Sequence, residues 1–128
     1  MDTRDIVEIQ QLMAHYGHLV DAKQWLRLGE IFSDDGIFDV IAYDAGRHEG
    51  LRAVIAFFEK ANHPPAHHST NLYVYEEAGM TRAWSKYAVP SDGGKMFGGD
   101  YKDALVKTPS GWRIRERFVT ARWPSPGQ

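Results

Sequence analysis

The sequence predicts an α+β fold in which helices pack against one face of a curved, mostly antiparallel sheet. Two observations indicate this class. In the first half of the chain, apolar side chains recur every three or four residues, which is the spacing of amphipathic helices. From residue 67 onward, β-branched and aromatic stretches alternate with short segments of turn-forming residues, which is typical of strands joined by turns. Helices followed by a run of strands are the pattern of an α+β domain.

Three helices are expected before residue 62. The first covers residues 3–21, and Asp2 or Thr3 can cap its start. Its apolar stripe consists of Ile6, Ile9, Met13, Tyr16 and Val20. A second, short helix is expected over about residues 23–32, where the turn cluster Ser33–Gly36 ends it. The third helix is expected over about residues 49–61.

One strand is expected between the second and third helices, and four more are expected after the third. Their ranges are residues 37–43, 67–76, 81–89, 96–107 and 111–123. Because short, turn-rich segments separate the last four, each should pair antiparallel with the next as a meander. The pair Gly98 and Gly99 lies inside one of these strands, where it indicates a bulge or bend that curves the sheet.

The composition fits a single domain over residues 1–128, with a loose tail or subunit contact at residues 124–128. Hydrophobic residues make up 43% and charged residues 25%, which is ordinary for a globular protein. The net charge of −2 without a basic block argues against a nucleic-acid partner. With no cysteine, disulfides and thiolate chemistry are excluded. The first residues hold no apolar run that could form a signal or a membrane span, so we expect a cytoplasmic location and no membrane partner.

Two adjacent histidines open the strand at residues 67–76 and carry the clearest chemical signal. Imidazole titrates near neutrality, so a histidine held on a sheet is suited to moving protons. Strand alternation places His67 and His68 on opposite faces, so at most one enters a pocket. Asn71 shares the face of His67. A single strand histidine is more often structural than catalytic, and the local pattern leaves both roles open.

Asp21 is the candidate carboxylate that would orient a histidine base. It ends the first predicted helix, where the helix dipole disfavours a negative charge by up to about 1 kcal/mol. A competing interpretation is a capping box for the second helix, with Asp21 as the N-cap and Gln24 three residues later. The two roles are compatible, because one carboxylate oxygen can cap while the other holds a ring.

Other motifs give weaker signals. His63, His67 and His68 are close in sequence, but no carboxylate stands at a recognisable ligand spacing, so no metal is expected. The chain lacks a nucleophile elbow, a phosphate-binding loop and a dinucleotide fingerprint, so no organic cofactor is expected either.

Three arginines alternate along the last strand, at positions 113, 115 and 117, and nominally share one face. The simplest interpretation is a solvated basic stripe. A bulge or a strong twist would turn one of them inward, where it could stabilise an anion. The sequence leaves open which arginine that would be.

A series of motifs follows the chain in a recognisable order. They are Leu19-Val20-Asp21, Trp25, Ile31-Phe32-Ser33-Asp34-Asp35-Gly36, His67-x-x-Thr70-Asn71, Gly98-Gly99-Asp100-Tyr101-x-Asp103-x-Leu105 and Gly111-Trp112-Arg113-Ile114. Over about residues 4–120 the chain resembles the SnoaL-like branch of the NTF2-like superfamily. That branch includes scytalone dehydratase, hexachlorocyclohexane dehydrochlorinase and bile-acid 7α-dehydratase.

The resemblance implies a cone-shaped α+β barrel with three N-terminal helices and a ligand pocket inside. By motif position it implies that Asp21 and His67 form the Asp–His pair that acts as the base in the eliminating members. The residues expected to bind substrate are Tyr16, Trp25, Asn71, Tyr101 and Arg117.

The residue pattern and the resemblance together predict a cofactor-independent lyase. We expect a dehydratase-type elimination on a small, largely apolar, cyclic substrate. An isomerase or a polyketide cyclase would use the same proton abstraction, and a non-catalytic ligand-binding module is a third alternative. The exposed aromatic face of such a sheet usually pairs with another subunit, so a homo-oligomer, a dimer or a trimer, is expected.

Overall fold

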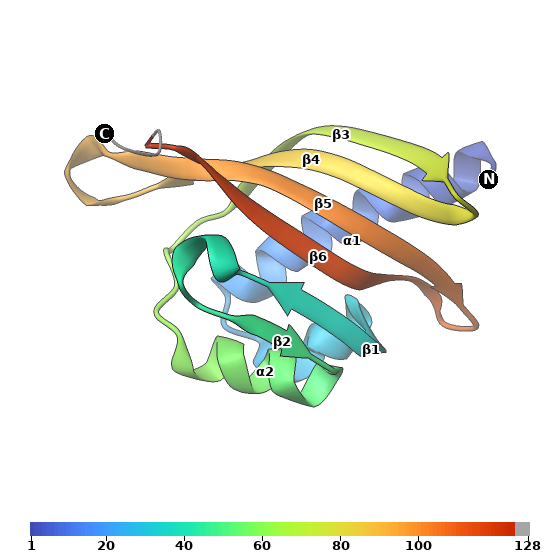
Figure 1. Ribbon diagram of the computed structural model, residues 1–128, viewed down its shortest axis with the longest axis horizontal. Helices are drawn as coiled ribbons and strands as arrows, with labels where there is room; N and C mark the ends of the chain where they lie inside the picture. The colour runs from blue at the N-terminus through green and yellow to red at the C-terminus, as the bar shows by residue number, and fades with distance from the viewer. Residues whose placement is uncertain (125–128) are drawn as a thin grey trace.

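The computed structural model describes residues 1–124 and shows one curved sheet with helices on one side (Figure 1). The described residues form two α-helices, α1 (Thr3–Asp21) and α2 (Leu51–Lys60). The same part of the chain contains three short 3₁₀ turns, η1 (Trp25–Glu30), η2 (Ile41–Tyr43) and η3 (Asp92–Gly94). The strands are β1 (Phe32–Asp39), β2 (Arg47–Glu49), β3 (His68–Glu77), β4 (Met80–Pro90), β5 (Met96–Thr108) and β6 (Gly111–Trp123). Most of the expected tail, residues 125–128, lies outside the described residues.

The strands form a single sheet in the order β2-β1-β6-β5-β4-β3. The meander of β3, β4, β5 and β6 is antiparallel, as predicted, and β1 joins β6 in parallel. The α+β class and the mostly antiparallel sheet are therefore confirmed. Within residues 1–124 the sheet ends at β2 and β3 and is not closed into the expected barrel.

The first helix has its predicted bounds, and the next segments differ from the prediction. The Asp2 side chain caps α1 by accepting a hydrogen bond from the Asp5 main-chain N–H. The Asp5 side chain accepts one from the Asp2 main-chain N–H, which completes a capping box. The capping box predicted for the second helix is wrong, because Gln24 occupies the N-cap position of η1 and makes no side-chain capping bond. Instead of an α-helix, the chain forms one short 3₁₀ segment there. Of the three expected helices, two are α-helices.

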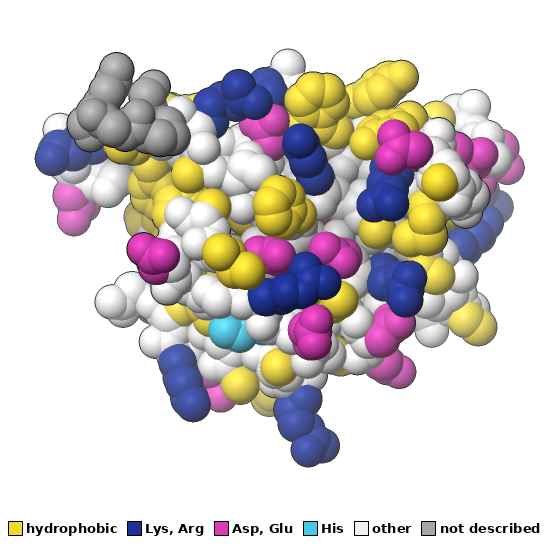
Figure 2. Space-filling model, in the orientation of Figure 1, with side chains coloured by type: hydrophobic (Ala, Val, Ile, Leu, Met, Phe, Trp, Pro, Cys, Tyr) yellow, Lys and Arg dark blue, Asp and Glu magenta, His cyan; other side chains and the backbone are white. Residues whose placement is uncertain are grey.

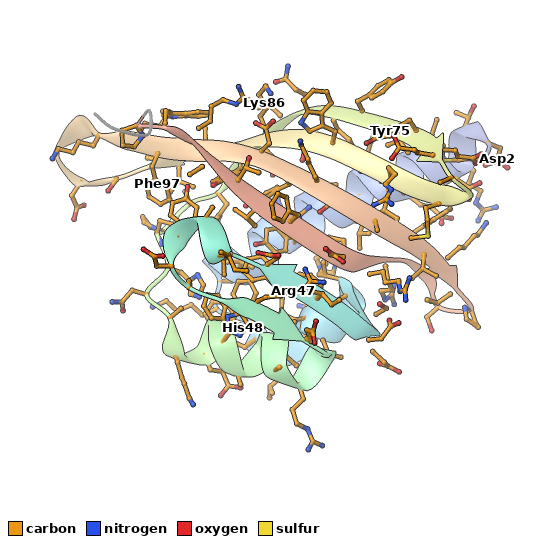
Figure 3. All side chains as sticks on the ribbon, viewed as in Figure 1. Asp2, Arg47, His48, Tyr75, Lys86 and Phe97 are labelled. Carbon is orange, nitrogen blue, oxygen red and sulfur yellow. The ribbon has the colours of Figure 1, made fainter. Side chains whose placement is uncertain are left out.

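The first strand also begins earlier than predicted. The residues Ser33–Gly36, expected as a turn, lie within β1, and their pairing with β6 is interrupted between Phe32 and Ile37. The predicted strand end at residues 40–43 is replaced by η2. The short strand β2 was not predicted. Arg47 of β2 forms ion pairs with Asp39 of β1 and Glu116 of β6 (Figure 3).

Two bulges in the β5–β6 pair shape the sheet. The first lies between Gly98 and Gly99, as the glycine pair predicted. A Cβ on Gly99 would lie 1.8 Å from the carbonyl oxygen of Thr120. β5 and β6 can therefore approach this closely only because residue 99 is a glycine. The second leaves Arg115 as an extra residue on β6 between Ile114 and Glu116. It reverses the alternation that follows, and Arg117 consequently points inward.

The core lies between the sheet and the helices. In Figure 1, α1 runs behind the long strands and α2 lies beside β1 and β2. Edge-to-face aromatic contacts join α1 to the sheet, with the ring of Tyr16 6.2 Å from that of Phe32 and 5.9 Å from that of Tyr101. In residues 1–124, no helix combines the length and the apolar character needed to cross a membrane.

Candidate active site

Asp21 and His67 lie in direct contact. Asp21 is the last residue of α1, and His67 immediately precedes β3. The Oδ1 atom of Asp21 lies 2.6 Å from Nδ1 of His67, and Oδ2 accepts a hydrogen bond of 3.2 Å from the His67 main-chain N–H. The carboxylate thus holds both the ring and the backbone of the histidine.

This contact fixes the orientation of the imidazole. In a neutral ring, Nδ1 donates its hydrogen to the carboxylate, and Nε2 keeps a lone pair. The side chain of His67 is 10% exposed, whereas that of Asp21 is 27% exposed. The histidine therefore faces the interior, and the carboxylate lies against a groove along α1 and β3.

A cavity of about 300 Å³ lies next to His67 on the inner side of the sheet. Its size is at the lower end of the range for small-molecule sites. Aromatic rings make up much of its wall, namely Tyr16, Phe38, Tyr43, Phe58, Tyr87 and Tyr101. Phe97 of β5 lines the end near η2, with its ring 6.2 Å from that of Tyr43 (Figure 3). Such a wall suits a compact, largely apolar ring.

Three buried tyrosines of the cavity, Tyr16, Tyr87 and Tyr101, stay protonated. The Tyr87 hydroxyl donates to the carbonyl oxygen of Thr120 at 2.8 Å, so in its 2.6 Å contact with Tyr43 the hydrogen comes from Tyr43. Burial, and then the bond to Tyr43, raise the pKa of Tyr87. Burial also raises the pKa of Tyr16 and of Tyr101. These phenol groups can form hydrogen bonds with a ligand, but they do not act as bases at neutral pH. The group that accepts a proton at neutral pH is therefore an imidazole.

Arg117 lies behind the cavity wall. Its guanidinium stands over the rings of Tyr16 and Tyr101, at 4.3 and 3.9 Å from their centroids, and does not line the cavity itself. Two hydrogen bonds of 2.9 Å join it to Asp103, and both side chains are at most 1% exposed. We expected Arg117 to contact the substrate directly, and in the structure it packs on the two tyrosine rings that line the cavity.

Trp25 and Asn71 also lie outside the cavity wall. The Trp25 ring packs against that of Phe58, with centroids 5.7 Å apart, and does not line the cavity. Asn71 is exposed and has a φ of 57° at a bulge between Thr70 and Tyr73. Asn71 lines the groove along α1, which Asp21 and His67 also line, and it does not line the cavity. Of the expected substrate-binding residues, only Tyr16 and Tyr101 line the cavity.

His63 is a cavity residue that the sequence did not single out. It is half-buried, and its Nε2 lies 3.1 Å from the carbonyl oxygen of Phe58. Burial and the nearby His67 lower its pKa. In the sequence it lies in a proline-flanked loop between the third predicted helix and the next strand. The available signal was its place four residues before His67, on a segment stiffened by Pro64 and Pro65. No cluster of three or more potential metal ligands occurs within residues 1–124.

Comparisons with known proteins identify relatives of this fold. Residues 1–118 match the SnoaL-like domain. No curated protein matches the sequence significantly. An NTF2-like protein with a cystatin-like fold from Novosphingobium aromaticivorans is 24% identical, with a TM-score of 0.80 over 96% of this chain and 85% of that one. A protein of unknown function from Nostoc punctiforme is 17% identical, with a TM-score of 0.83 over 98% and 97%. A protein from Novosphingobium aromaticivorans provisionally named a scytalone dehydratase is 18% identical, with a TM-score of 0.71 over 91% and 83%.

Proposed function

The chain belongs to the family of SnoaL-like domains, and from this premise we propose that it is a cofactor-independent lyase. The proposed reaction is the elimination of water from a small, largely apolar, cyclic β-hydroxy ketone. The observation that carries the proposal is the position of His67, whose ring lines the cavity while Asp21 holds its Nδ1 at 2.6 Å.

The proposed reaction begins with proton transfer to His67. Its Nε2 accepts the proton from the carbon next to the ketone, and the Asp21 carboxylate stabilises the imidazolium that forms. The electron pair of the broken C–H bond forms the new C=C bond as the C–O bond to the leaving hydroxyl breaks. The proton on Nε2 then passes to the departing hydroxide, so the products are an enone and water.

The cavity would assist by placement and by excluding water. Tyr43 lines the cavity, and 41% of the residue is exposed to solvent. A hydroxyl group that leaves the substrate near Tyr43 could therefore exchange with solvent. A substrate oxygen could take over the hydrogen bond that Tyr43 now donates to Tyr87. The provisional name of one structural neighbour, a scytalone dehydratase, is consistent with an elimination reaction.

The test is a screen of cyclic β-hydroxy ketones, starting with 3-hydroxycyclohexanone and fused bicyclic analogues, for ultraviolet-absorbing enone. His67→Ala should lower kcat/KM by about 10²- to 10⁴-fold, because the general base is lost. Asp21→Asn should cause a loss of similar order, because the amide offers Nδ1 no negative charge and favours the wrong tautomer.

Two matched variants serve as controls. His68→Ala removes the adjacent, exposed histidine, and Asp44→Asn changes a carboxylate at a position with a φ of 55°, which asparagine tolerates. Both should retain the activity of the parent protein. Activity that persists in His67→Ala and Asp21→Asn contradicts the proposal. A rearranged product without loss of water would assign the same base to an isomerase or a cyclase.

A further inference from the structure

His63 is a second imidazole on the cavity wall, and the proposed reaction does not use it. It lies in the connection between α2 and β3. Its ring stacks on that of Phe58, with centroids 5.0 Å apart and planes at 15°, and lies 5.1 Å from the ring of Trp25. The two aromatic rings hold the imidazole in a fixed position.

Hydrogen bonding assigns the proton of this imidazole. The carbonyl oxygen of Phe58, 3.1 Å from Nε2 of His63, can only accept a hydrogen bond. Nε2 therefore carries the hydrogen, and Nδ1 of the neutral ring carries a lone pair. Burial, the largest cause, and the nearby His67 and Lys23 lower the pKa of His63, which favours the neutral ring.

The lone pair on Nδ1 of His63 is available to a ligand. Among the residues that the structure describes, no group hydrogen-bonds to this atom, and it is not among the polar atoms sealed inside the fold. The surrounding wall is largely apolar and includes Phe38, Phe57, Pro64 and Val89. A ligand that fills the cavity excludes water from this wall, and an acceptor that is then left without a donor is costly.

We propose that Nδ1 of His63 accepts a hydrogen bond from a hydroxyl group of the ligand, so that the cavity selects hydroxylated ring compounds over the corresponding ethers. This deepens the proposed function, because it names a hydroxyl that the substrate retains while His67 removes a proton from carbon. The selection itself needs only binding. It therefore holds whether or not the bound compound reacts.

The test compares the binding of 2-naphthol with that of 2-methoxynaphthalene, which has the same ring system and no donor. Dissociation constants are measured by NMR titration of the full chain. The parent protein should bind 2-naphthol about three- to tenfold more tightly, the range expected for one neutral hydrogen bond. His63→Phe keeps an aromatic ring on Phe58 and removes the lone pair, so it should abolish the preference. His68→Phe makes the same change at an exposed histidine outside the cavity and should retain the preference.

A measurement on the parent protein covers the case in which His63→Phe does not fold. The imidazole ¹⁵N resonances report hydrogen bonding at each ring nitrogen, and 2-naphthol should shift Nδ1 of His63. Equal affinity for the two compounds, no binding of 2-naphthol, a preference that persists in His63→Phe, or a shift confined to His67 would overturn the proposal. The failure of every elimination assay would instead refute the proposed lyase, and the binding preference would remain.

Discussion

Asp21 and His67 are 46 positions apart in the sequence, and each was identified by a different kind of signal. A carboxylate at the end of a helix is locally unfavourable, so its presence there called for a partner. The histidine was one of two candidates, and motif spacing selected it. The structure brings this pair together. His63 could not be found in the same way, because its role depends on the stacked ring of Phe58, which is adjacent only in the folded chain.

Asp100 gives a prediction for acid stability at the scale of one residue. The bidentate contact from Arg122 is the largest of the contacts that hold the pKa of Asp100 at about 2, and Trp84 and Lys86 add to it. Because the folded-state pKa lies below the ordinary value of 3.8, the stabilisation is complete above about pH 4 and is lost as the pH falls to 2.

Urea unfolding of Asp100→Asn across pH checks this expectation. At pH 7 the variant should be less stable by about 2 kcal/mol, the free-energy equivalent of the pKa shift. The difference between variant and parent should shrink as the pH falls from 4 to 2. A difference that is constant over that range would show that the carboxylate charge makes no contribution.

At the scale of elements, the bulge at Arg115 decides the surroundings of Arg117. Strict alternation assigns Arg113, Arg115 and Arg117 to one face. One extra residue reverses the facing, and Arg117 becomes 1% exposed. The sequence allowed this outcome but did not locate the bulge, because a bulge depends on pairing between strands and not on the strand alone. The same holds for Asn71, which lies at a bulge in β3 that the sequence did not locate.

The buried pair of Arg117 and Asp103 leads to a double-mutant prediction. Asp103→Leu should destabilise the fold by about 3–5 kcal/mol, because it leaves a buried guanidinium without its partner. Arg117→Met combined with Asp103→Leu should recover much of that loss, since an apolar pair removes both charges. Chemical unfolding of the single and double variants gives the coupling energy. If the losses simply add, the two side chains are not coupled.

At the scale of the whole molecule, the sequence predicted the class of fold and the meander better than the complete topology. Each turn between β3 and β6 is short, so neighbours in sequence become neighbours in the sheet. The parallel pairing of β1 with β6 joins two segments that are far apart in the sequence, and no local pattern encodes it. The edge strand β2 has three residues, too few for a periodic signal.

The face of the sheet without helices leads us to propose self-association. Large aromatic side chains lie there among charged ones (Figure 2). The Tyr73 residue is 63% exposed, and Trp84 and Phe118 are each 41% exposed. Analytical ultracentrifugation at micromolar concentration should give a dimer or a trimer. Phe118→Glu should shift the protein toward monomer, and Leu26→Glu, a control at a residue in η1 that is 86% exposed, should not. A monomeric parent protein would refute the expectation.

The central claim is that His67, held by Asp21, removes a proton from carbon inside the cavity. The most direct measurement is hydrogen–deuterium exchange at the carbon next to the ketone of 2-tetralone, followed by NMR in D₂O. This ketone has no leaving group, so exchange reports proton abstraction alone. The parent protein should accelerate exchange over buffer, and His67→Ala and Asp21→Asn should each lose that acceleration by about 10²-fold or more. Exchange at the same rate in the parent protein and in both variants would contradict the claim.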